Sequence, residues 1–266
     1  MENILKERIN NGVKTIGTFF EMGSSEAVEC LGYTGLDYII IDTEHGPFDV
    51  ESTMNFVRAA ELKNLTPLVR VKDISRPSIL KNLDIGAMGL VVPCVETIEE
   101  VEKLVEWSKY YPLGKRGFFN ARKTGYGQED FSKDVIEYFS ISNRETLLIP
   151  QCETKGCLDN IEEIAKIEGV DGIFIGPYDL SIGLGIPAQF DNPTFISAVA
   201  RILKACKDNN KFSFIFTGDP AMVNEYFDQG FDSVALGTDI SFYISSIKGV
   251  VEDIRNRKKS TVKGGY

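Results

Sequence analysis

The sequence predicts a single (β/α)8 barrel, and three observations support this fold. Eight short, continuous apolar runs recur along the 266 residues, with amphipathic segments between them. Apolar runs without alternation are typical of parallel strands that are buried on both faces. No break in composition divides the chain, so we treat residues 1–266 as one domain, and this length is typical of such a barrel.

The elements follow one another in a regular order. The expected strands are 16–20, 38–42, 67–71, 89–93, 147–153, 172–177, 212–217 and 233–237. The expected helices include 52–63, 76–85, 98–109, 158–167, 193–209 and 220–229. Glycines that can end a helix in the left-handed conformation precede several strands, as Gly86 and Gly230 do. An open doubly wound sheet is the alternative, but no GxGxxG motif follows the first strand.

Two segments depart from this alternation. Residues 111–143, between the fourth and fifth strands, are rich in glycine, arginine and aromatic residues. We expect a long loop there that either carries function or packs on a neighbouring subunit. Residues 255–266 are basic and polar, and we expect a flexible, solvated tail.

Composition excludes several classes of protein. Hydrophobic residues make up 43% and charged residues 26%, which is enough for a large core. The formal charge of −10 argues against nucleic acid or an anionic membrane as the main partner. No apolar run is long enough to span a bilayer, and the five cysteines are scattered, so we expect reduced thiols in a cytoplasmic protein.

Polar residues gather where the expected strands end, which is where barrels place their functional groups. Asp42 closes the second strand and is followed by His45, the only histidine of the chain. A carboxylate three residues away can fix the tautomer of the imidazole and stabilise its charged form. Arg70 lies inside the third strand and needs an anionic partner: Asp42, Glu153, a substrate carboxylate or a developing oxyanion.

The fifth and sixth strands lead to carboxylates. Glu153 closes the fifth strand, and Asp179 follows the sixth in the turn Gly176-Pro177-Tyr178-Asp179. Two converging carboxylates repel each other unless a cation lies between them, and oxygen ligands favour Mg²⁺ or Mn²⁺ over zinc. The competing interpretation is a pair of helix-capping acids. Free N–H groups of the turn can bind a carboxylate.

Weaker signals point to other chemistry. Lys72 and Lys155 lie beyond two strand ends and are candidates for a Schiff base. Thr217-Gly218 and Gly237-Thr238 end the last two strands, where many barrels bind phosphate.

Several longer stretches resemble one known family. DTEHGPFDV, PLVRV, GAMGLVVPCVET, GKRGF, QCETKGCLDNIEEI and VDGIFIGPYDLSIGLGIPAQFDNP are similar, in order over residues 3 to 250, to the HpcH/HpaI family of class II pyruvate aldolases. The resemblance implies a barrel of the phosphoenolpyruvate/pyruvate type. It also implies a homo-oligomer, a trimer or hexamer, whose neighbouring subunits exchange a C-terminal helix.

The resemblance also implies a role for each site residue. Glu153 and Asp179 would bind a divalent metal (Mg²⁺, Mn²⁺ or Co²⁺), and Gln151 would line its pocket. His45 with Asp42 would form the acid/base pair, and Arg70 would stabilise the pyruvate enolate. The backbone of Gly176 to Asp179, including Pro177 and Tyr178, would hold the pyruvate carboxylate. Phe19 on the first strand and Tyr178 would shape the aldehyde pocket.

The implied activity is the reversible cleavage of a 4-hydroxy-2-oxo acid to pyruvate and an aldehyde. Two alternatives remain open at this point. One is a related lyase that acts on an acyl-CoA or citrate-like substrate. The other is a catalytically silent barrel that binds a 2-oxo acid.

Overall fold

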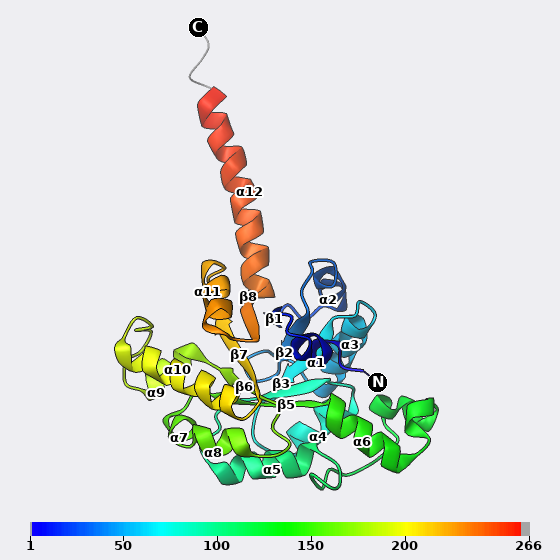
Figure 1. The fold of residues 1–266 in the computed structure, drawn as a ribbon. Helices are drawn as coiled ribbons and strands as arrows, with labels where there is room; N and C mark the ends of the chain where they lie inside the picture. Colours follow the sequence, from blue (N-terminus) through cyan, green and yellow to red (C-terminus); the bar gives the residue numbers. More distant parts are fainter. Residues whose placement is uncertain (1, 262–266) are drawn as a thin grey trace.

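The protein folds into a closed barrel of eight parallel strands surrounded by helices (Figure 1). The structure is a computed structural model that describes the backbone of residues 2–261 and the side chains of residues 2–256. The strands follow one another in sequence order around the barrel, and β1 closes the ring against β8. The predicted (β/α)8 barrel is confirmed.

The strands lie on the eight predicted apolar runs. Their bounds are β1 Thr15–Phe20, β2 Tyr38–Asp42, β3 Thr66–Arg70, β4 Gly89–Val92, β5 Leu147–Cys152, β6 Gly172–Ile175, β7 Phe212–Thr217 and β8 Ser233–Thr238. β6 ends two residues earlier than predicted, because Pro177 opens the next helix.

All six predicted helices are present, but residues 158–167 fall into two short helices that meet at Asn160. The α-helices are α1 Ile4–Asn10, α2 Ser25–Leu31, α3 Val50–Glu61, α4 Arg76–Asp84, α5 Ile98–Ser108, α6 Val135–Glu145, α7 Lys155–Asp159, α8 Ile161–Lys166, α9 Pro177–Gly183, α10 Pro193–Asp208, α11 Ala221–Gln229 and α12 Asp239–Thr261. Two 3-10 helices, η1 Arg122–Gly127 and η2 Asp130–Ser132, precede α6.

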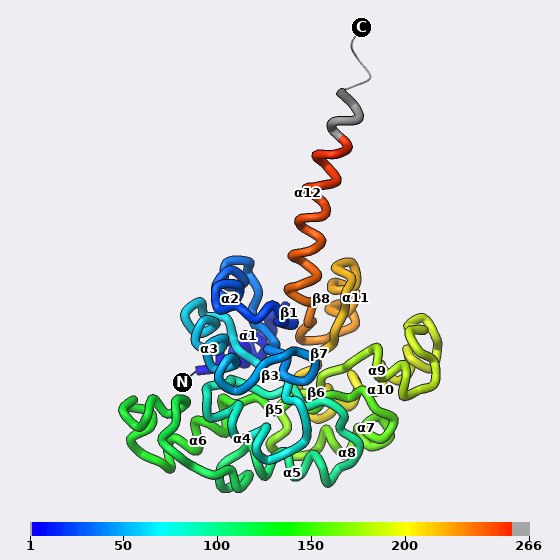
Figure 2. Tube along the Cα trace, turned by 180° about the vertical axis from the view of Figure 1, so that it is seen from behind, coloured from blue at the N-terminus to red at the C-terminus, as the bar shows by residue number. Residues whose placement is uncertain are grey.

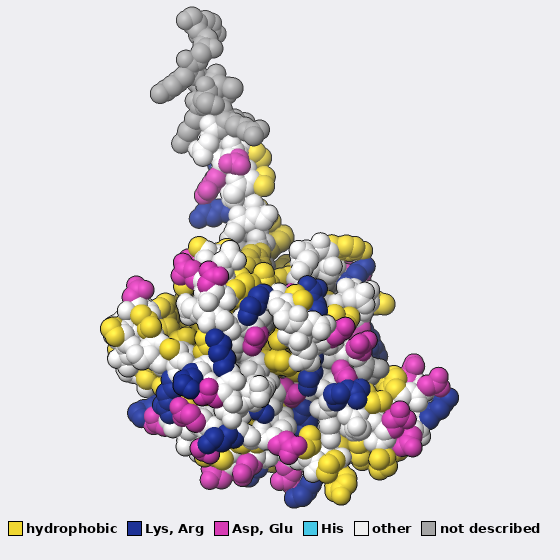
Figure 3. All heavy atoms as spheres, viewed as in Figure 1, with side chains coloured by type: hydrophobic (Ala, Val, Ile, Leu, Met, Phe, Trp, Pro, Cys, Tyr) yellow, Lys and Arg dark blue, Asp and Glu magenta, His cyan; other side chains and the backbone are white. Residues whose placement is uncertain are grey.

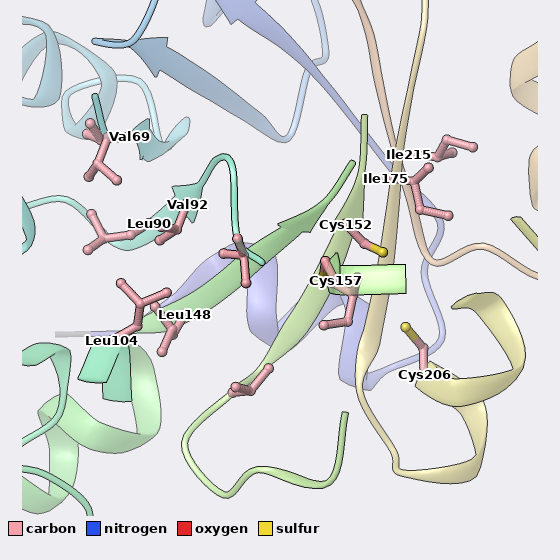
Figure 4. Packing of buried hydrophobic residues seen from close by; sticks show 14 of the residues in the cluster. Val69, Leu90, Val92, Leu104, Leu148, Cys152, Cys157, Ile175, Cys206 and Ile215 are labelled. Carbon is pink, nitrogen blue, oxygen red and sulfur yellow. The ribbon is translucent and has the colours of Figure 1, made fainter. Parts of the chain in front are cut away.

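Apolar side chains fill two layers. Inside the barrel, Phe19, Ile40, Leu68, Phe174 and Phe214 belong to one buried cluster. Between the strands and the surrounding helices, a second cluster includes Val69, Leu90, Leu104 and Leu148, together with the thiols of β5, α7 and α10 (Figure 4). All five cysteines of the chain are free. Alternate residues of each strand thus face the two layers, which fixes the side chains that reach the barrel mouth.

The segment 111–143 differs from the expected open loop, since it contains η1, η2 and most of α6. The Lys123 ammonium contacts the carbonyl of Ala87, just before β4, so the segment covers the N-terminal end of the barrel. Phe118 packs against Tyr110 and Phe139. The segment thus begins as irregular chain with two short 3-10 helices and ends in α6, and several of its aromatic residues pack together. A functional or intersubunit role for it stays a prediction.

The C-terminal segment is also more ordered than expected. α12 continues through Thr261, so the first part of the predicted tail 255–266 is helical, and residues 262–266 lie outside the described part. The helix projects away from the barrel in both views (Figures 1 and 2). Among the residues that the structure describes, no helix combines the length and apolar character needed to cross a membrane.

A buried ion pair fastens the ends of the strands opposite the barrel mouth. The Lys109 ammonium at the end of α5 is 1% exposed and lies 2.7 Å from a carboxylate oxygen of Asp171. The same oxygen accepts the backbone N–H of Leu148 at 2.9 Å, and Lys6 binds the other oxygen at 2.6 Å. These contacts join the starts of β5 and β6, the two strands whose far ends lead to Glu153 and Asp179.

We expect Lys109→Met to lower the free energy of unfolding by about 3 kcal/mol, because it leaves Asp171 and two carbonyls without their buried partner. Urea denaturation followed by circular dichroism measures this change. Lys204→Met is the matched control, since its exposed pair with Asp208 is worth about 0.5 kcal/mol or less. Equal losses in both variants would contradict a structural role for the Lys109 pair.

Candidate active site

A cleft of about 200 Å³ opens at the C-terminal mouth of the barrel. Its floor is apolar, with Phe19, Phe174 and Phe216 in edge-to-face contact. Its polar lining comes from four of the strand ends that the sequence singles out. These residues are His45, Arg70, Gln151, Gly176, Pro177, Tyr178 and Asp179. The cleft therefore brings most of the predicted site residues together.

Arg70 and Asp42 form a two-pronged ion pair at the base of the cleft. The register of β2 and β3 places the two residues side by side. Arg70 Nε donates to Asp42 Oδ1 at 2.9 Å, and Nη2 donates to Oδ2 at 2.6 Å. Both side chains are nearly inaccessible to water, so each charge depends on the other. Asp42 is thus the structural anchor of Arg70, one of the partners the sequence left open.

Asp42 does not contact the His45 imidazole, so the predicted pairing of these two side chains was wrong. Instead, Asp42 Oδ1 accepts the backbone N–H groups of Glu44 and His45, at 3.1 and 3.3 Å. The chain turns tightly here, because a Cβ at Gly46 would lie 2.2 Å from the Asp42 carbonyl oxygen. The His45 side chain is 69% exposed and points its Nε2 toward Glu44, 3.9 Å from Oε2.

Glu44 therefore lies between His45 and Arg70. Its Oε2 atom also lies 3.2 Å from Arg70 Nη1. Burial raises the pKa of Glu44, and Arg70 and His45 act in the opposite direction. Glu44 was not among the predicted site residues, although it stands between Asp42 and His45 in the same motif.

Glu153 is buried at the end of β5, 4% exposed. The backbone N–H of Cys94, held at a positive φ of 55°, donates to its Oε1 at 2.7 Å. Gln151 contacts the other carboxylate oxygen. Burial raises the pKa of Glu153 to about 7; the Cys94 N–H opposes this shift, and the carboxylates of Asp179 and Glu44 add to it.

Asp179 lies in the first turn of α9, at the rim of the same cleft. No side chain caps this turn, so its N–H groups are open to a ligand. The turn packs closely on β5, because a Cβ at Gly176 would lie 2.6 Å from both Gln151 Nε2 and Glu153 Oε2. Tyr178 is half-exposed and contacts Phe190 edge to face.

The carboxylates around Glu153 fit a divalent cation. Glu153 is held partly protonated near neutral pH by burial and by two neighbouring carboxylates, which is the arrangement that a bound cation would relieve. The buried Gln151 Oε1 next to it has no hydrogen-bond partner among the described residues. Within that same part of the chain, no three His, Cys, Asp or Glu residues group as a complete protein cage. Two protein ligands would leave positions for water and substrate.

Of the weaker sequence signals, only Thr238 reaches the cleft. Lys155 pairs with Asp159 on the surface of α7, and Lys72 lines a separate groove beside α3 and α4. Thr238 lines the cleft, whereas Thr217 lines a neighbouring groove between α10 and α11. The cleft also contains Glu21, which directly follows β1 and was not predicted. The rule that found the other residues, a polar group after a strand end, applies equally to Glu21.

The model of one protein family, HpcH/HpaI aldolase/citrate lyase, matches residues 15–246. The chain belongs to this family. The prediction of a carbon–carbon lyase of the class II pyruvate aldolase type is thereby confirmed at the level of the family.

Two characterised relatives span nearly the whole chain. A hydroxypyruvate/pyruvate aldolase from Roseobacter denitrificans is 34% identical over 250 residues, which cover 93% of this chain and 95% of that protein. A 2-keto-3-deoxy-L-rhamnonate aldolase from Salmonella schwarzengrund is 32% identical over 273 residues, covering 100% and 98%.

Solved structures show the same architecture. A HpcH/HpaI aldolase/citrate lyase family protein from Burkholderia cenocepacia J2315 superimposes with a TM-score of 0.88 at 30% identity, covering 95% of this chain and 99% of that one. The citrate synthase SbnG superimposes with a TM-score of 0.86 at 29% identity, covering 96% and 98%.

We expect Mn²⁺ affinity to rise with pH up to about 7 and then to level off. Below pH 7 a proton on Glu153 competes with the cation and must leave on binding; above pH 7 the carboxylate is already ionised. Calorimetric titrations between pH 5.5 and 8.5 measure this profile. Glu153→Gln should weaken binding and flatten the profile, whereas the exposed control Glu99→Gln should leave both unchanged. If the Mn²⁺ affinity of the wild type did not change with pH, Glu153 would not be the metal ligand that we assign.

Proposed function

We propose that the protein is a metal-dependent class II aldolase that reversibly cleaves a 4-hydroxy-2-oxo acid to pyruvate and an aldehyde. The observation that carries this proposal is the cleft lined by His45, Arg70 and Asp179. The buried Glu153 lies directly behind its lining, in contact with Gln151. The two relatives named as aldolases support the same reaction class.

Glu153 and Asp179 would hold the divalent cation, a role that fits their position at neighbouring strand ends. When bound, such a cation acts as a Lewis acid that polarises the keto group and stabilises the enolate. The uncapped first turn of α9 presents backbone N–H groups beside this position, where they can bind the carboxylate of a 2-oxo acid. Gln151 and Gly176 close the pocket from the β5 and β6 side.

Arg70 would supply a second positive charge where the enolate oxygen develops. Asp42 fixes the guanidinium through Nε and Nη2, and the Phe19 ring lies 4.7 Å from its Cζ atom. A donor that is rigid before the reaction stabilises developing charge without the cost of reorganisation. Asp42 therefore contributes as a positioning residue and not as a proton carrier.

His45 would move the proton of the C4 hydroxyl. Its exposed imidazole lines the cleft beyond the end of β2 and takes no part in the Arg70–Asp42 ion pair. In the cleavage direction it accepts the hydroxyl proton, directly or through water, as the C3–C4 bond breaks. In the addition direction it returns this proton to the new alkoxide. The Glu44 carboxylate lies 3.9 Å from its Nε2 atom.

A citrate-like substrate is the second candidate, because the citrate synthase SbnG is 29% identical over nearly the whole chain. A tricarboxylate requires several cationic groups, whereas Arg70 is the one Lys or Arg lining the cleft within the described residues, and it is already paired. The charge of the cleft therefore favours the aldolase.

The two halves of the mechanism can be separated by substitution. We expect His45→Ala to reduce aldol cleavage by about 10²- to 10⁴-fold, because an acid/base group is lost. It should retain more of metal-dependent oxaloacetate decarboxylation, where no hydroxyl proton moves. Asp179→Ala should lose both reactions. Pyruvate release at saturating Mn²⁺, coupled to lactate dehydrogenase, measures both activities.

Equal proportional losses in His45→Ala would contradict the proton-transfer role. Trapping of a pyruvate adduct on Lys72 or Lys155 by borohydride would contradict the metal-dependent mechanism as a whole, since it would reveal a Schiff base.

We further propose a homo-oligomer, a trimer or hexamer, in which α12 packs on a neighbouring subunit. All described side chains of α12 from 240 to 256 are exposed. Apolar residues repeat every three or four positions along it: Ile240, Tyr243, Ile244, Ile247, Val250, Val251 and Ile254. Apolar atoms follow one edge of the helix (Figure 3). A stripe of this length is typical of a helix that is buried against a partner.

The cytoplasmic location remains a prediction.

We expect the wild type to have a mass of three or six times 29.6 kDa in multi-angle light scattering. Ile244→Glu/Ile247→Glu should dissociate it, because two charges would be buried at the interface. Ser245→Glu/Ser246→Glu adds the same charge at adjacent positions outside the stripe and should leave the assembly intact. A wild-type mass near 29.6 kDa would contradict this proposal.

A further inference from the structure

We propose that Glu21 selects the aldehyde, favouring neutral, hydroxylated acceptors and excluding acceptors that carry a carboxylate. This inference rests on the proposed aldolase function and names the substrate class of the same site. It comes from the position of one carboxylate that the mechanism above does not use.

Glu21 stands at the acceptor end of the cleft. It directly follows β1, and in a closed ring of eight strands β1 lies across the barrel from β5, which leads to Glu153. Its electrostatic neighbours are Asp42, Asp239, Arg70 and His45, not the Glu153–Asp179 pair. The carboxylate therefore lies on the side of His45, where the aldehyde enters, and not on the side of pyruvate.

The Glu21 carboxylate has no hydrogen-bond or ion-pair partner among the described residues. Among the described residues, no cation lies within 4.0 Å of it and no side-chain hydrogen bond satisfies it, although it is partly buried and lines the cleft. Such a group is costly to hold in a cleft unless a ligand donates a hydrogen bond to it. A hydroxyl group on the aldehyde supplies that donor, and a carboxylate cannot.

The rest of the acceptor end offers no compensating positive charge. The Arg70 guanidinium is shared between Asp42 and Glu44, and no lysine lines the cleft. The other polar groups on this side are the His45 imidazole, which the mechanism uses as the proton acceptor, and the side chains of Thr238 and Tyr178. An anionic aldehyde would therefore meet like charge without a counter-ion, whereas a polyhydroxylated one meets hydrogen-bonding groups.

Asp239 acts as the positioning residue for Glu21. It is 4% exposed, and its carboxylate accepts the backbone N–H groups of Glu21 at 2.9 Å and Met22 at 3.0 Å. Asp239 is also the first residue of α12. The loop that carries Glu21 is thus fastened to the base of the projecting helix, away from the chemical centre.

The test compares three two-carbon aldehydes with pyruvate and Mn²⁺: glycolaldehyde bears a hydroxyl, glyoxylate a carboxylate, and acetaldehyde neither. We expect the wild type to prefer glycolaldehyde over acetaldehyde and acetaldehyde over glyoxylate in kcat/KM. Glu21→Gln should raise the glyoxylate-to-acetaldehyde ratio about tenfold, because it removes one like charge near the acceptor. Glu29→Gln on α2 carries the same change in net charge; its half-exposed side chain lies near Lys63 and outside the cleft, so the ratios should stay unchanged.

The variant Asp239→Asn tests the positioning role of Asp239 independently. It should shift the glyoxylate-to-acetaldehyde ratio in the same direction, and Glu21→Gln/Asp239→Asn should shift it no further than Glu21→Gln alone. A simple loss of folding would lower all three rates and leave the ratios in place.

The outcomes separate the two proposals. If the wild type forms adducts but the Glu21→Gln ratios equal those of Glu29→Gln, the role of Glu21 is overturned and the aldolase function stands. If the wild type forms no adduct with any aldehyde and releases no pyruvate from 4-hydroxy-2-oxo acids, the proposed function itself is overturned.

Discussion

Repulsion between carboxylates at one barrel mouth is the constraint on which the site depends. Five acidic side chains converge around a single arginine: Glu21, Asp42, Glu44, Glu153 and Asp179. One arginine neutralises only the pair closest to it. The remaining charge can be relieved by protonation, which the raised pKa of Glu153 indicates, or by a bound cation. The proposed metal dependence and the exclusion of anionic aldehydes both follow from this excess of negative charge.

The barrel holds these groups in place from a distance. Strand register sets Asp42 beside Arg70, and the Lys109–Asp171 pair fastens the opposite ends of β5 and β6. Gly46 allows the chain to turn tightly against the backbone carbonyl of Asp42, and Gly176 allows the start of α9 to approach the Glu153 carboxylate. Rigid support of this kind suits a site that stabilises developing charge, because side chains that had to reorient during the reaction would stabilise the transition state less.

Much of the fold and part of the site could be predicted from the sequence. Continuous apolar runs locate all eight strands, and polar residues at their ends locate the cleft. Side-chain pairing was harder to predict. Asp42 is three residues from His45 in sequence, but the β2–β3 register places Asp42 beside Arg70, and its carboxylate binds the guanidinium. The helices within segment 111–143 could not be predicted, because its glycines and arginines hide the apolar pattern of α6; Tyr111, Phe119 and Tyr126 are exposed, whereas Phe118 packs against Phe139. Glu21 follows a strand end without any motif around it.

The most direct test of the central claim is a crystal structure of the protein with Mn²⁺ and pyruvate, located by anomalous scattering. The account predicts a manganese peak between the carboxylates of Glu153 and Asp179, with pyruvate beside it and Arg70 still paired to Asp42. A peak elsewhere in the cleft, or ordered pyruvate with Glu153 and Asp179 free of metal, would contradict it.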